Sequence, residues 1–386
     1  MCTHLKAIFV RVVFVLASTL IGLLICEEIV RFVAPQNIAV PWQSEINGIM
    51  APRPNVQGRH TIPNTFDVTV SFNSQRFRGR RDFQLEPSPG VIRLAALGDS
   101  FTFGFGANDN ETYPAQLERI LQRWLAESAS HSTVEVINAS NAGSGTGEQA
   151  LWYDTWVKQF RPQLAVLTVV PNDIDDDLAR GLFFLDENGR ALPRPFKELS
   201  AADRPLRVIR RAVNAFPGYA FLAQYSQLLA FLRNFSSAAV GRYRQATFAT
   251  DATPSQTGSP SERFQKEGLP MMAEEVRWLQ KRVQKSGAHL VVVFVPFRET
   301  IYSSQTPASD QIQWKSEAIA EVLSEVCSQE GIPFADLTAQ IREQARQLPK
   351  ALYYDGFDNH PTPEGYRIIA EAIAKFLVEN FLLKHE

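Results

Sequence analysis

The sequence predicts an α/β fold, in which a parallel β-sheet carries helices on both faces and is preceded by one N-terminal transmembrane helix. Two observations support this prediction. From Val91 onward, short apolar runs alternate with amphipathic helical patterns, as in parallel sheets covered by helices. Before that, residues 7–26 are apolar except for Arg11. A helix of about 20 residues spans roughly 30 Å, which is the thickness of a bilayer core.

The charges around the apolar run predict its orientation. Lys6 and Arg11 lie towards its N-terminal side, and Glu27 and Glu28 follow it. The positive-inside rule therefore places the N-terminus in the cytoplasm and the rest of the chain outside, in a periplasmic or extracellular location. A cleaved signal peptide is the alternative, but no small-x-small site follows the run and Pro35 comes soon after it. We favour an uncleaved anchor; a buried core helix is the third interpretation.

The chain divides into three parts on this pattern. Residues 1–34 form the anchor, and 35–90 form a linker with a small β-containing segment. That linker is rich in Pro, Asn and Gln up to about residue 65, and a strand, FDVTVSF, follows over 66–72. Residues 91–386 form the main domain, with an insertion at about 180–265 that does not follow the alternation. We interpret the insertion as a helical subdomain; covering the site or touching the membrane are its alternative roles.

Each element of the main domain has its own signal. A continuous apolar run such as LAVLTVV is typical of a parallel strand buried on both faces. Thr112 and Pro114 supply a cap and a first-turn proline for the first helix. The expected strands are VIRLAALG (91–98), VEVINAS (134–140), LAVLTVV (164–170), LVVVFVP (290–296) and IPFADL (332–337). The other expected helices lie at about 148–160, 270–286, 309–329 and after Thr362 and Pro363.

Composition excludes several classes of function. The net charge of −2 gives no electrostatic basis for binding nucleic acid. Cys2, Cys26 and Cys327 are scattered, with neither a CxxC pair nor a zinc spacing, so we expect no metal site and no structural disulfide. The acidic run at 173–177 lacks the glycine and the terminal glutamate of an EF-hand loop, and we interpret it as a solvated acidic turn.

Four motifs carry residues that are suited to chemistry. Ser100 follows the first strand in GDS, Gly143 follows the second in NASNAGSG, and Asn172 follows the third in VVPNDIDDD. His360 precedes the last helix in YYDGFDNHPTPEGY. Each motif alone also fits a turn, a helix cap or a surface loop. Ligands gather at the carboxyl ends of parallel strands, however, so all four together predict one site.

The residue types fit acyl transfer. A serine hydroxyl becomes a good nucleophile when a histidine takes its proton, and that histidine needs a carboxylate on its other ring nitrogen. Asp358 and Asp355 are the two candidates for the carboxylate. A glycine lets a backbone N–H approach a substrate oxygen, and the amide of Asn172 supplies a second donor to an oxyanion.

These motifs, in this order, resemble the SGNH (GDSL-type) hydrolases. The phrases NSQRFRGRR and GDSFTFGFGANDNETYPAQLE further resemble membrane-anchored bacterial members. The resemblance covers residues 91–386, with the insertion outside the usual core. It implies a flavodoxin-like sheet, Ser100 as nucleophile, His360 as base and Asp358 as the residue that orients it. It also implies an oxyanion hole made by the N–H groups of Ser100 and Gly143 with the side chain of Asn172, and no cofactor.

Two departures from the family pattern stand out. Val170 occupies a position where the third block usually carries glycine, and Phe357 occupies the aspartate position of the usual Asp-x-x-His. Relatives with such an anchor carry Asp-x-His, so Asp358 is preferred over Asp355. We expect an esterase outside the cytoplasm that hydrolyses or transfers O-acetyl groups of an envelope carbohydrate. The alternatives are a lipase or lysophospholipase-type esterase, and a non-catalytic glycan-binding component of a polysaccharide assembly.

Overall fold

The computed structural model describes residues 2–128, 131–195, 212–213, 216, 218–236, 259–302, 306–355 and 359–382. The chain forms two compact units. The smaller contains residues 1–41, 58–67 and 209–257, and the larger contains 42–57, 68–208 and 258–386.

The larger unit is built on one parallel sheet of five strands in the order β12-β11-β8-β6-β7. The strands are β6 (Val91–Gly98), β7 (Thr133–Asn138), β8 (Leu164–Val169), β11 (His289–Phe294) and β12 (Phe334–Asp336). In the register, Leu94 of β6 faces Val136 of β7 on one side and Leu164 of β8 on the other. All five predicted strands are therefore present, and the predicted α/β class is confirmed.

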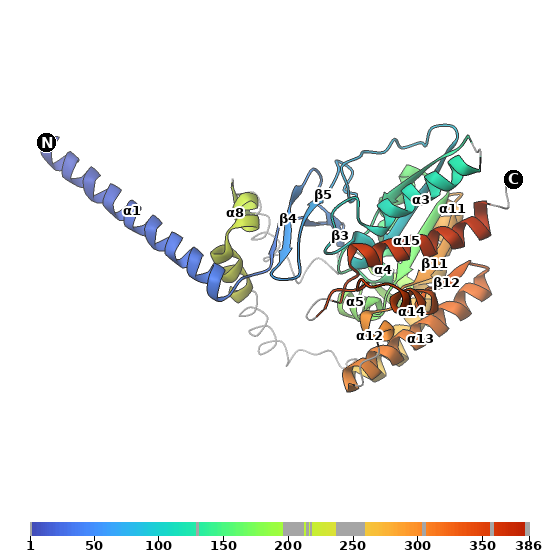
Figure 1. The fold of residues 1–386 in the computed structure, drawn as a ribbon. Coiled ribbons are helices and arrows are strands. Elements are labelled where there is room, and N and C mark those ends of the chain that lie inside the picture. Colours follow the sequence, from blue (N-terminus) through green and yellow to red (C-terminus); the bar gives the residue numbers. More distant parts are fainter. Residues whose placement is uncertain are drawn as a thin grey trace. The chain divides into compact units, whose positions relative to one another are not determined.

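Helices cover both faces of this sheet (Figure 1). On one face, α3 (Tyr113–Glu127), α14 (Thr338–Gln347) and α15 (Pro363–Leu377) form a single apolar core with the strands. On the other face, α4 (Thr146–Thr155), α11 (Leu269–Lys285) and α13 (Pro307–Glu330) form a second core. The sheet is thus buried on both sides, which explains why its strands are continuously apolar. Helix α14 is the one large element of this set that the sequence pattern did not predict.

Shorter elements complete the larger unit. They are β2 (Gln43–Ile46), β3 (Ile49–Pro52), β5 (Phe66–Ser71, which begins in the smaller unit), α2 (Ser100–Phe103), the 3₁₀ turn Val157–Phe160, α5 (Asp173–Arg180), β9 (Phe183–Leu185), β10 (Ala191–Pro193), α10 (Pro260–Arg263), the π turn Phe264–Gly268, α12 (Arg298–Ile301) and the π turn Val378–Leu382.

The segment predicted as a linker up to residue 65 contains four short strands. Strands β2 and β3 form an antiparallel hairpin around Asn47 and Gly48, both with positive φ. Strand β1 (Ile38–Ala39) pairs with β4 (Gln57–Ile62). These strands are short and mixed in polarity, and their turn residues dominate the composition, so the pattern resembles a linker.

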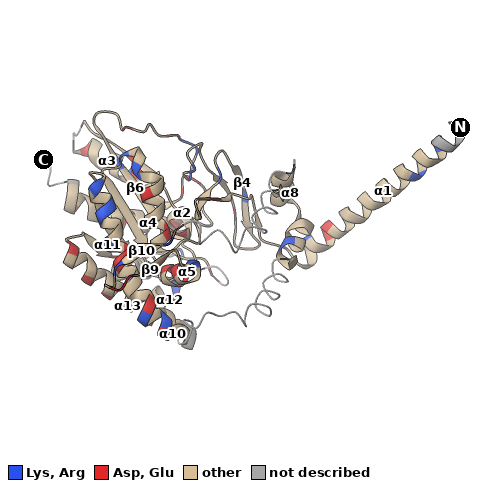
Figure 2. Ribbon diagram, turned by 180° about the vertical axis from the view of Figure 1, so that it is seen from behind, with Lys and Arg blue, Asp and Glu red and all other residues tan. Residues whose placement is uncertain are grey.

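The smaller unit contains α1 (Cys2–Val33), β1, most of β4, α8 (Tyr219–Tyr225) and a further helix over residues 227–236. Lys6–Val33 of α1 has the length and apolar composition to cross a membrane, and its side chains are not buried by protein. Charged side chains occur only towards the two ends of α1, and none lies between Arg11 and Glu27 (Figure 2).

Candidate active site

The nucleophile candidate stands at the first turn after the central strand. Strand β6 ends at Gly98, and helix α2 begins at Ser100 with Asp99 as its N-cap. A Cβ at Gly98 would lie 2.0 Å from the Thr102 hydroxyl oxygen, so only glycine allows the chain to turn here. The Asp99 carboxylate accepts a hydrogen bond from the Phe101 N–H at 2.8 Å, which fixes the turn.

The structure brings Ser100 and His360 together. The Ser100 Oγ lies 2.8 Å from the His360 Nε2, although 260 residues separate them in the chain. The His360 ring stacks on Phe105 with the ring centroids 4.3 Å apart, and Phe101 contacts it from another side. Both Ser100 and His360 keep part of their surface exposed, so a substrate can reach them. This is the geometry that proton transfer from a serine to a histidine requires.

The Asp99 carboxyl makes a contact with the Ser100 side chain as well. Its Oδ2 lies 3.0 Å from the Ser100 Oγ. Asp99 is fully buried, and this desolvation raises its pKa although hydrogen bonds and the nearby His360 oppose the shift. The Ser100 hydroxyl is the donor in this contact, and the Asp99 carboxyl oxygen accepts.

Gly143 and Asn172 follow the two strands that flank β6. Gly143 has a φ of 81°, and a Cβ there would meet nothing closer than the Met50 methyl at 3.9 Å, so its conformation and not crowding requires glycine. Asn141, in the same loop, donates its N–H to the Gly98 carbonyl at 3.1 Å. That hydrogen bond ties the Gly143 loop to the turn that carries Ser100.

The Asn172 amide is held by an acid one turn further along α5. The Asn172 Nδ2 donates to the Asp176 Oδ2 at 2.7 Å. Asp176 is partly buried, and desolvation raises its pKa to about 6, with the Asn172 hydrogen bond opposing the shift. This bond uses one of the two amide hydrogens of Asn172. Asn172 occupies the N-cap position of α5 without making a side-chain capping bond.

The acidic run 173–177 is a helical segment and not the predicted solvated turn. Asp173 is fully buried and accepts from the Thr146 hydroxyl at 3.1 Å. Asp177 accepts the Gly147 N–H at 3.0 Å and shares a hydrogen bond with the buried Glu275 of α11. The prediction was wrong because α4 and α11 pack against this run. Residues of α11 lie about 100 positions away in the chain, so the local sequence gives no indication of this packing.

Burial controls the ionisation of these acids. Desolvation raises the pKa of Asp177 to about 7, and it raises the pKa values of Asp173 and Glu275 well above the usual range. A hydrogen bond between two carboxyl groups requires that one of them holds a proton. The first turn of α4 is therefore capped by a carboxyl from α5, which stabilises the partial positive charge at the helix N-terminus. Among the described residues, no group of three or more acidic, histidine or cysteine side chains is arranged to hold a metal ion.

The two aspartates proposed to orient His360 differ in what the structure describes. Asp358 lies outside the described residues. Asp355 is described, and its carboxylate is highly exposed and paired with the guanidinium of Arg298. The structure thus shows Asp355 engaged with a different partner.

Comparison with known proteins identifies the family. A family model described as "GDSL-like Lipase/Acylhydrolase family" matches residues 96–368, which is more than half of the chain. The chain belongs to the GDSL-like lipase/acylhydrolase family. It is therefore an ester-bond hydrolase by family. The comparison with curated proteins finds no match.

Two solved structures illustrate the distant similarity of this chain to known proteins. A G-D-S-L family protein from Desulfitobacterium hafniense DCB-2 is 13% identical with a TM-score of 0.40, and the match covers 74% of this chain and 99% of that one. A catalytic mutant of the acetylxylan esterase Axe2 from Geobacillus stearothermophilus is 15% identical with a TM-score of 0.40, over 74% and 94% of the two chains.

One arginine that the sequence analysis did not single out supports the nucleophile loop of this GDSL-like acylhydrolase. Arg78, in the basic phrase NSQRFRGRR, is buried and lies over the Phe103 ring. It donates to the Ala107 carbonyl at 2.8 Å and pairs with Asp109 at 3.1 Å. Desolvation lowers its pKa to about 10, which leaves it charged at neutral pH. The phrase NSQRFRGRR contains four arginines, and nothing in the phrase indicates which of them is buried.

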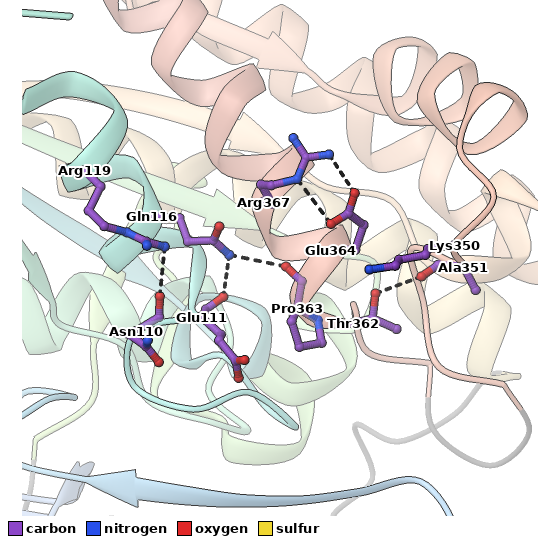
Figure 3. A pocket seen from close by; sticks show the side chains of 10 residues that line it. All are labelled: Asn110, Glu111, Gln116, Arg119, Lys350, Ala351, Thr362, Pro363, Glu364 and Arg367. Carbon is purple, nitrogen blue, oxygen red and sulfur yellow. Dashed lines mark hydrogen bonds and ion pairs between the residues drawn. The ribbon is translucent and has the colours of Figure 1, made fainter. Parts of the chain in front are cut away.

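The acylhydrolase also has an open polar pocket between the first turns of α3 and α15 (Figure 3). Its volume is about 510 Å³. It is lined by Asn110, Glu111, Gln116, Arg119, Lys350, Ala351, Thr362, Pro363, Glu364 and Arg367. Thr362, which lines this pocket, is the N-cap of α15. It lies two residues after His360 in the chain.

Proposed function

We propose that the protein is a membrane-anchored serine esterase that acts outside the cytoplasm on O-acetyl groups of an envelope carbohydrate. The observation that carries the catalytic part of this proposal is the 2.8 Å contact between the Ser100 Oγ and the His360 Nε2. That contact lies where β6 ends, at the carboxyl edge of a parallel sheet. The family supplies the ester-bond chemistry.

The reaction proceeds by acyl transfer through an acyl-enzyme. His360 takes the proton of Ser100 as the serine oxygen attacks the ester carbonyl. The tetrahedral oxyanion accepts hydrogen bonds from the N–H groups of Ser100 and Gly143 and from the Asn172 amide. His360 then gives its proton to the departing alcohol oxygen, and the ester bond breaks. Water, activated by His360, hydrolyses the acyl-enzyme, or an acceptor hydroxyl takes the acyl group in its place.

Asp358 completes the triad in this proposal. Asp355 is paired with Arg298 at an exposed position, which supports Asp358 as the residue that orients His360. The matched pair Asp358→Asn and Asp355→Asn tests the assignment. Changing the orienting carboxylate is expected to lower kcat by about 10²–10⁴-fold, because the imidazolium loses its partner, whereas changing the other leaves it within about two-fold. The reverse order of effects would assign the role to Asp355.

A polar substrate is supported by the pocket beside α15. Its lining includes the cations Arg119 and Lys350 together with amide and hydroxyl side chains, and such groups bind carbohydrate hydroxyls and carboxylates. The apolar α1 supports a location at the membrane, where envelope polysaccharides and their acetyl groups are found.

The test compares two substrate classes with the full-length enzyme in lipid nanodiscs. We expect acetate release from O-acetylated polysaccharide and little fatty-acid release from phospholipid. Arg119→Ala is expected to raise KM for the polysaccharide and to leave hydrolysis of p-nitrophenyl acetate unchanged, because the small ester does not reach the pocket. Preferential release of long-chain acids would favour the lipase alternative. Failure of a serine-directed phosphonate to label Ser100 would remove the catalytic proposal.

A further inference from the structure

The inserted segment of the smaller unit is joined to the end of the apolar helix. The Glu27 carboxylate, directly after the uncharged stretch of α1, accepts three hydrogen bonds from residues 226–228. These come from the Ser226 hydroxyl at 2.8 Å, the Gln227 N–H at 2.8 Å and the Leu228 N–H at 2.9 Å. Glu27 therefore caps the N-terminus of the helix over residues 227–236, where a carboxylate satisfies free N–H groups and the helix dipole.

Further hydrogen bonds hold the two helices of the insertion in place. The Gln227 side chain accepts the Gln36 N–H at 2.5 Å, and Asn234 donates to the Gln36 side chain at 3.1 Å. The Gln224 side chain, at the end of α8, accepts the Arg59 N–H at 2.9 Å. These contacts lie within the smaller unit, and those of Gln227 and Asn234 connect both ends of the 227–236 helix to Gln36, which follows α1.

The outer side of these two helices is apolar. Ala223 and Ala230, which are small, are their buried residues. The exposed apolar side chains are Phe216, Phe221, Leu222, Tyr225, Phe231, Leu232 and Phe235, with exposed fractions between 39% and 66%. At 100° per residue, positions 231, 232 and 235 share one side of the helix, opposite to Ala230. A helix of a water-soluble protein normally buries its large apolar residues. In these two helices the small alanines are buried and the large apolar side chains are exposed, which is the reverse arrangement.

The position of this face along α1 indicates what covers it. Glu27 lies where the uncharged run of α1 ends, and the last turns of α1 add the exposed Ile29, Phe32 and Val33. The insertion is thus held at the level where a membrane-spanning helix leaves the hydrocarbon core. Aromatic side chains concentrate at that level, because one part of the ring meets acyl chains and another meets headgroups.

We propose that the exposed apolar face of residues 216 and 218–236 lies in the headgroup and upper acyl layer of the membrane that α1 enters. This gives the protein a second, interfacial contact with lipid besides its anchor, and it rests on the anchoring part of the proposed function. The ligand is a lipid surface. A second copy of the chain and another protein are the competing occupants, and the experiment separates them.

The experiment places a fluorophore at defined positions in the full chain. Cys2→Ser and Cys26→Ser leave Cys327, which is buried, as the remaining native thiol. An environment-sensitive NBD label is attached to Phe235→Cys, with Leu16→Cys as a probe of α1 and Glu321→Cys, an exposed position of α13, as a water-exposed control. Each protein is reconstituted in phosphatidylcholine and phosphatidylglycerol vesicles that contain lipid with a nitroxide at a shallow or a deep acyl carbon.

We expect the label at position 235 to emit at shorter wavelength than the label at 321, and to be quenched more by shallow than by deep nitroxide. The label at 16 should be quenched more by deep nitroxide. Adding Phe231→Glu, which brings a charge to the face, should lower the quenching at 235 at least about two-fold by shifting the helix towards water. Ser236→Glu, a polar exposed neighbour, is the matched control and should leave it unchanged.

Three other results would overturn the proposed interfacial contact. Quenching at 16 without quenching at 235 would overturn the interfacial contact and leave the anchor intact. Quenching at 235 that disappears as protein density rises would show that a second copy covers the face, and would also overturn the proposal. Absence of quenching at both positions would overturn the anchor and this inference together.

Discussion

The two sides of the site are built in opposite ways. On the nucleophile side, named for the proposed role of Ser100, Ser100 and His360 lie among aromatic rings, with the buried acid Asp99 in contact with Ser100. On the oxyanion side, named for the proposed role of Gly143 and Asn172, the loops that carry these two residues lead into helices α4 and α5. Those helices pack together over the buried or partly buried acids Glu148, Asp173, Asp176, Asp177 and Glu275.

This difference indicates which side of the candidate site has a structure that depends on pH. The nucleophile side is fixed mainly by a glycine turn and by ring packing, with the buried Asp99 as its helix cap. The oxyanion side is fixed partly by carboxyls whose pKa values are raised by burial. We therefore expect the nucleophile side to tolerate alkaline conditions better than the oxyanion side.

The largest effect is expected from the nucleophile itself. Ser100→Ala and His360→Ala should each lower kcat for p-nitrophenyl acetate by about 10⁴–10⁶-fold, and the double variant should be no worse, because the two residues act as a unit. Ser128→Ala, at an exposed helix end, is the control. Substantial activity in Ser100→Ala would show that another residue is the nucleophile. The division of the site into a nucleophile side and an oxyanion side would then be wrong.

The next effect tests the support of the nucleophile side. Arg78→Met should destabilise the larger unit by about 3 kcal/mol, because it removes the ion pair of a buried guanidinium with Asp109 and its hydrogen bond to the Ala107 carbonyl. Arg81→Met is the matched control, since Arg81 is an exposed arginine of the same phrase paired with Glu118, and should cost at most about 1 kcal/mol. Thermal unfolding followed by near-UV circular dichroism measures both. Equal midpoints for the two variants would contradict the structural role of Arg78.

The oxyanion side is tested by Asn172→Ala. Loss of one oxyanion donor should lower kcat by about 10²–10³-fold and leave KM within a few-fold, because the bond strengthens in the transition state. Asn188→Ala, in the exposed β9–β10 turn, should change neither value. A change in KM alone would indicate that Asn172 binds the substrate without stabilising the oxyanion.

The smallest effect concerns the acids beneath the oxyanion loops. Burial raises the pKa of Asp177 to about 7, so the folded protein binds more protons than the unfolded chain between about pH 4 and 7. This stabilisation is fully present below the unfolded pKa and is lost as pH rises through the folded pKa. The melting temperature should therefore fall between pH 5 and 8.

Asp177→Asn should reduce that dependence. It keeps the oxygen that accepts the Gly147 N–H but cannot ionise, so the slope should become flatter by up to about 1.4 kcal/mol per pH unit. Asp175→Asn, an exposed neighbour paired with Lys315, should leave the slope unchanged. Parallel slopes for wild type and Asp177→Asn would show that the oxyanion side is no more dependent on pH than the nucleophile side.

Local patterns were sufficient for much of the fold and for part of the site. The five strands were predicted because continuous apolar runs bounded by turns have one stable place in a parallel sheet. Ser100, Gly143 and Asn172 were predicted because each follows such a strand, and His360 because it precedes a capped helix. By contrast, α14 has few apolar residues, and the strands before residue 63 are too short and mixed for their period to be recognised.

The sequence by itself determined the order of strands and helices, the apolar N-terminal helix and the residue types of the candidate site, because these depend on neighbours a few positions apart. Only the tertiary structure decided the rest. In the folded chain His360 contacts Ser100, and Asp355 is paired with Arg298. Arg78 and the acids of α5 are buried or partly buried, and Glu27 accepts hydrogen bonds from the insertion. Burial and ionisation depend on what packs against a residue from far along the chain, and charge in a sequence carries no record of that packing.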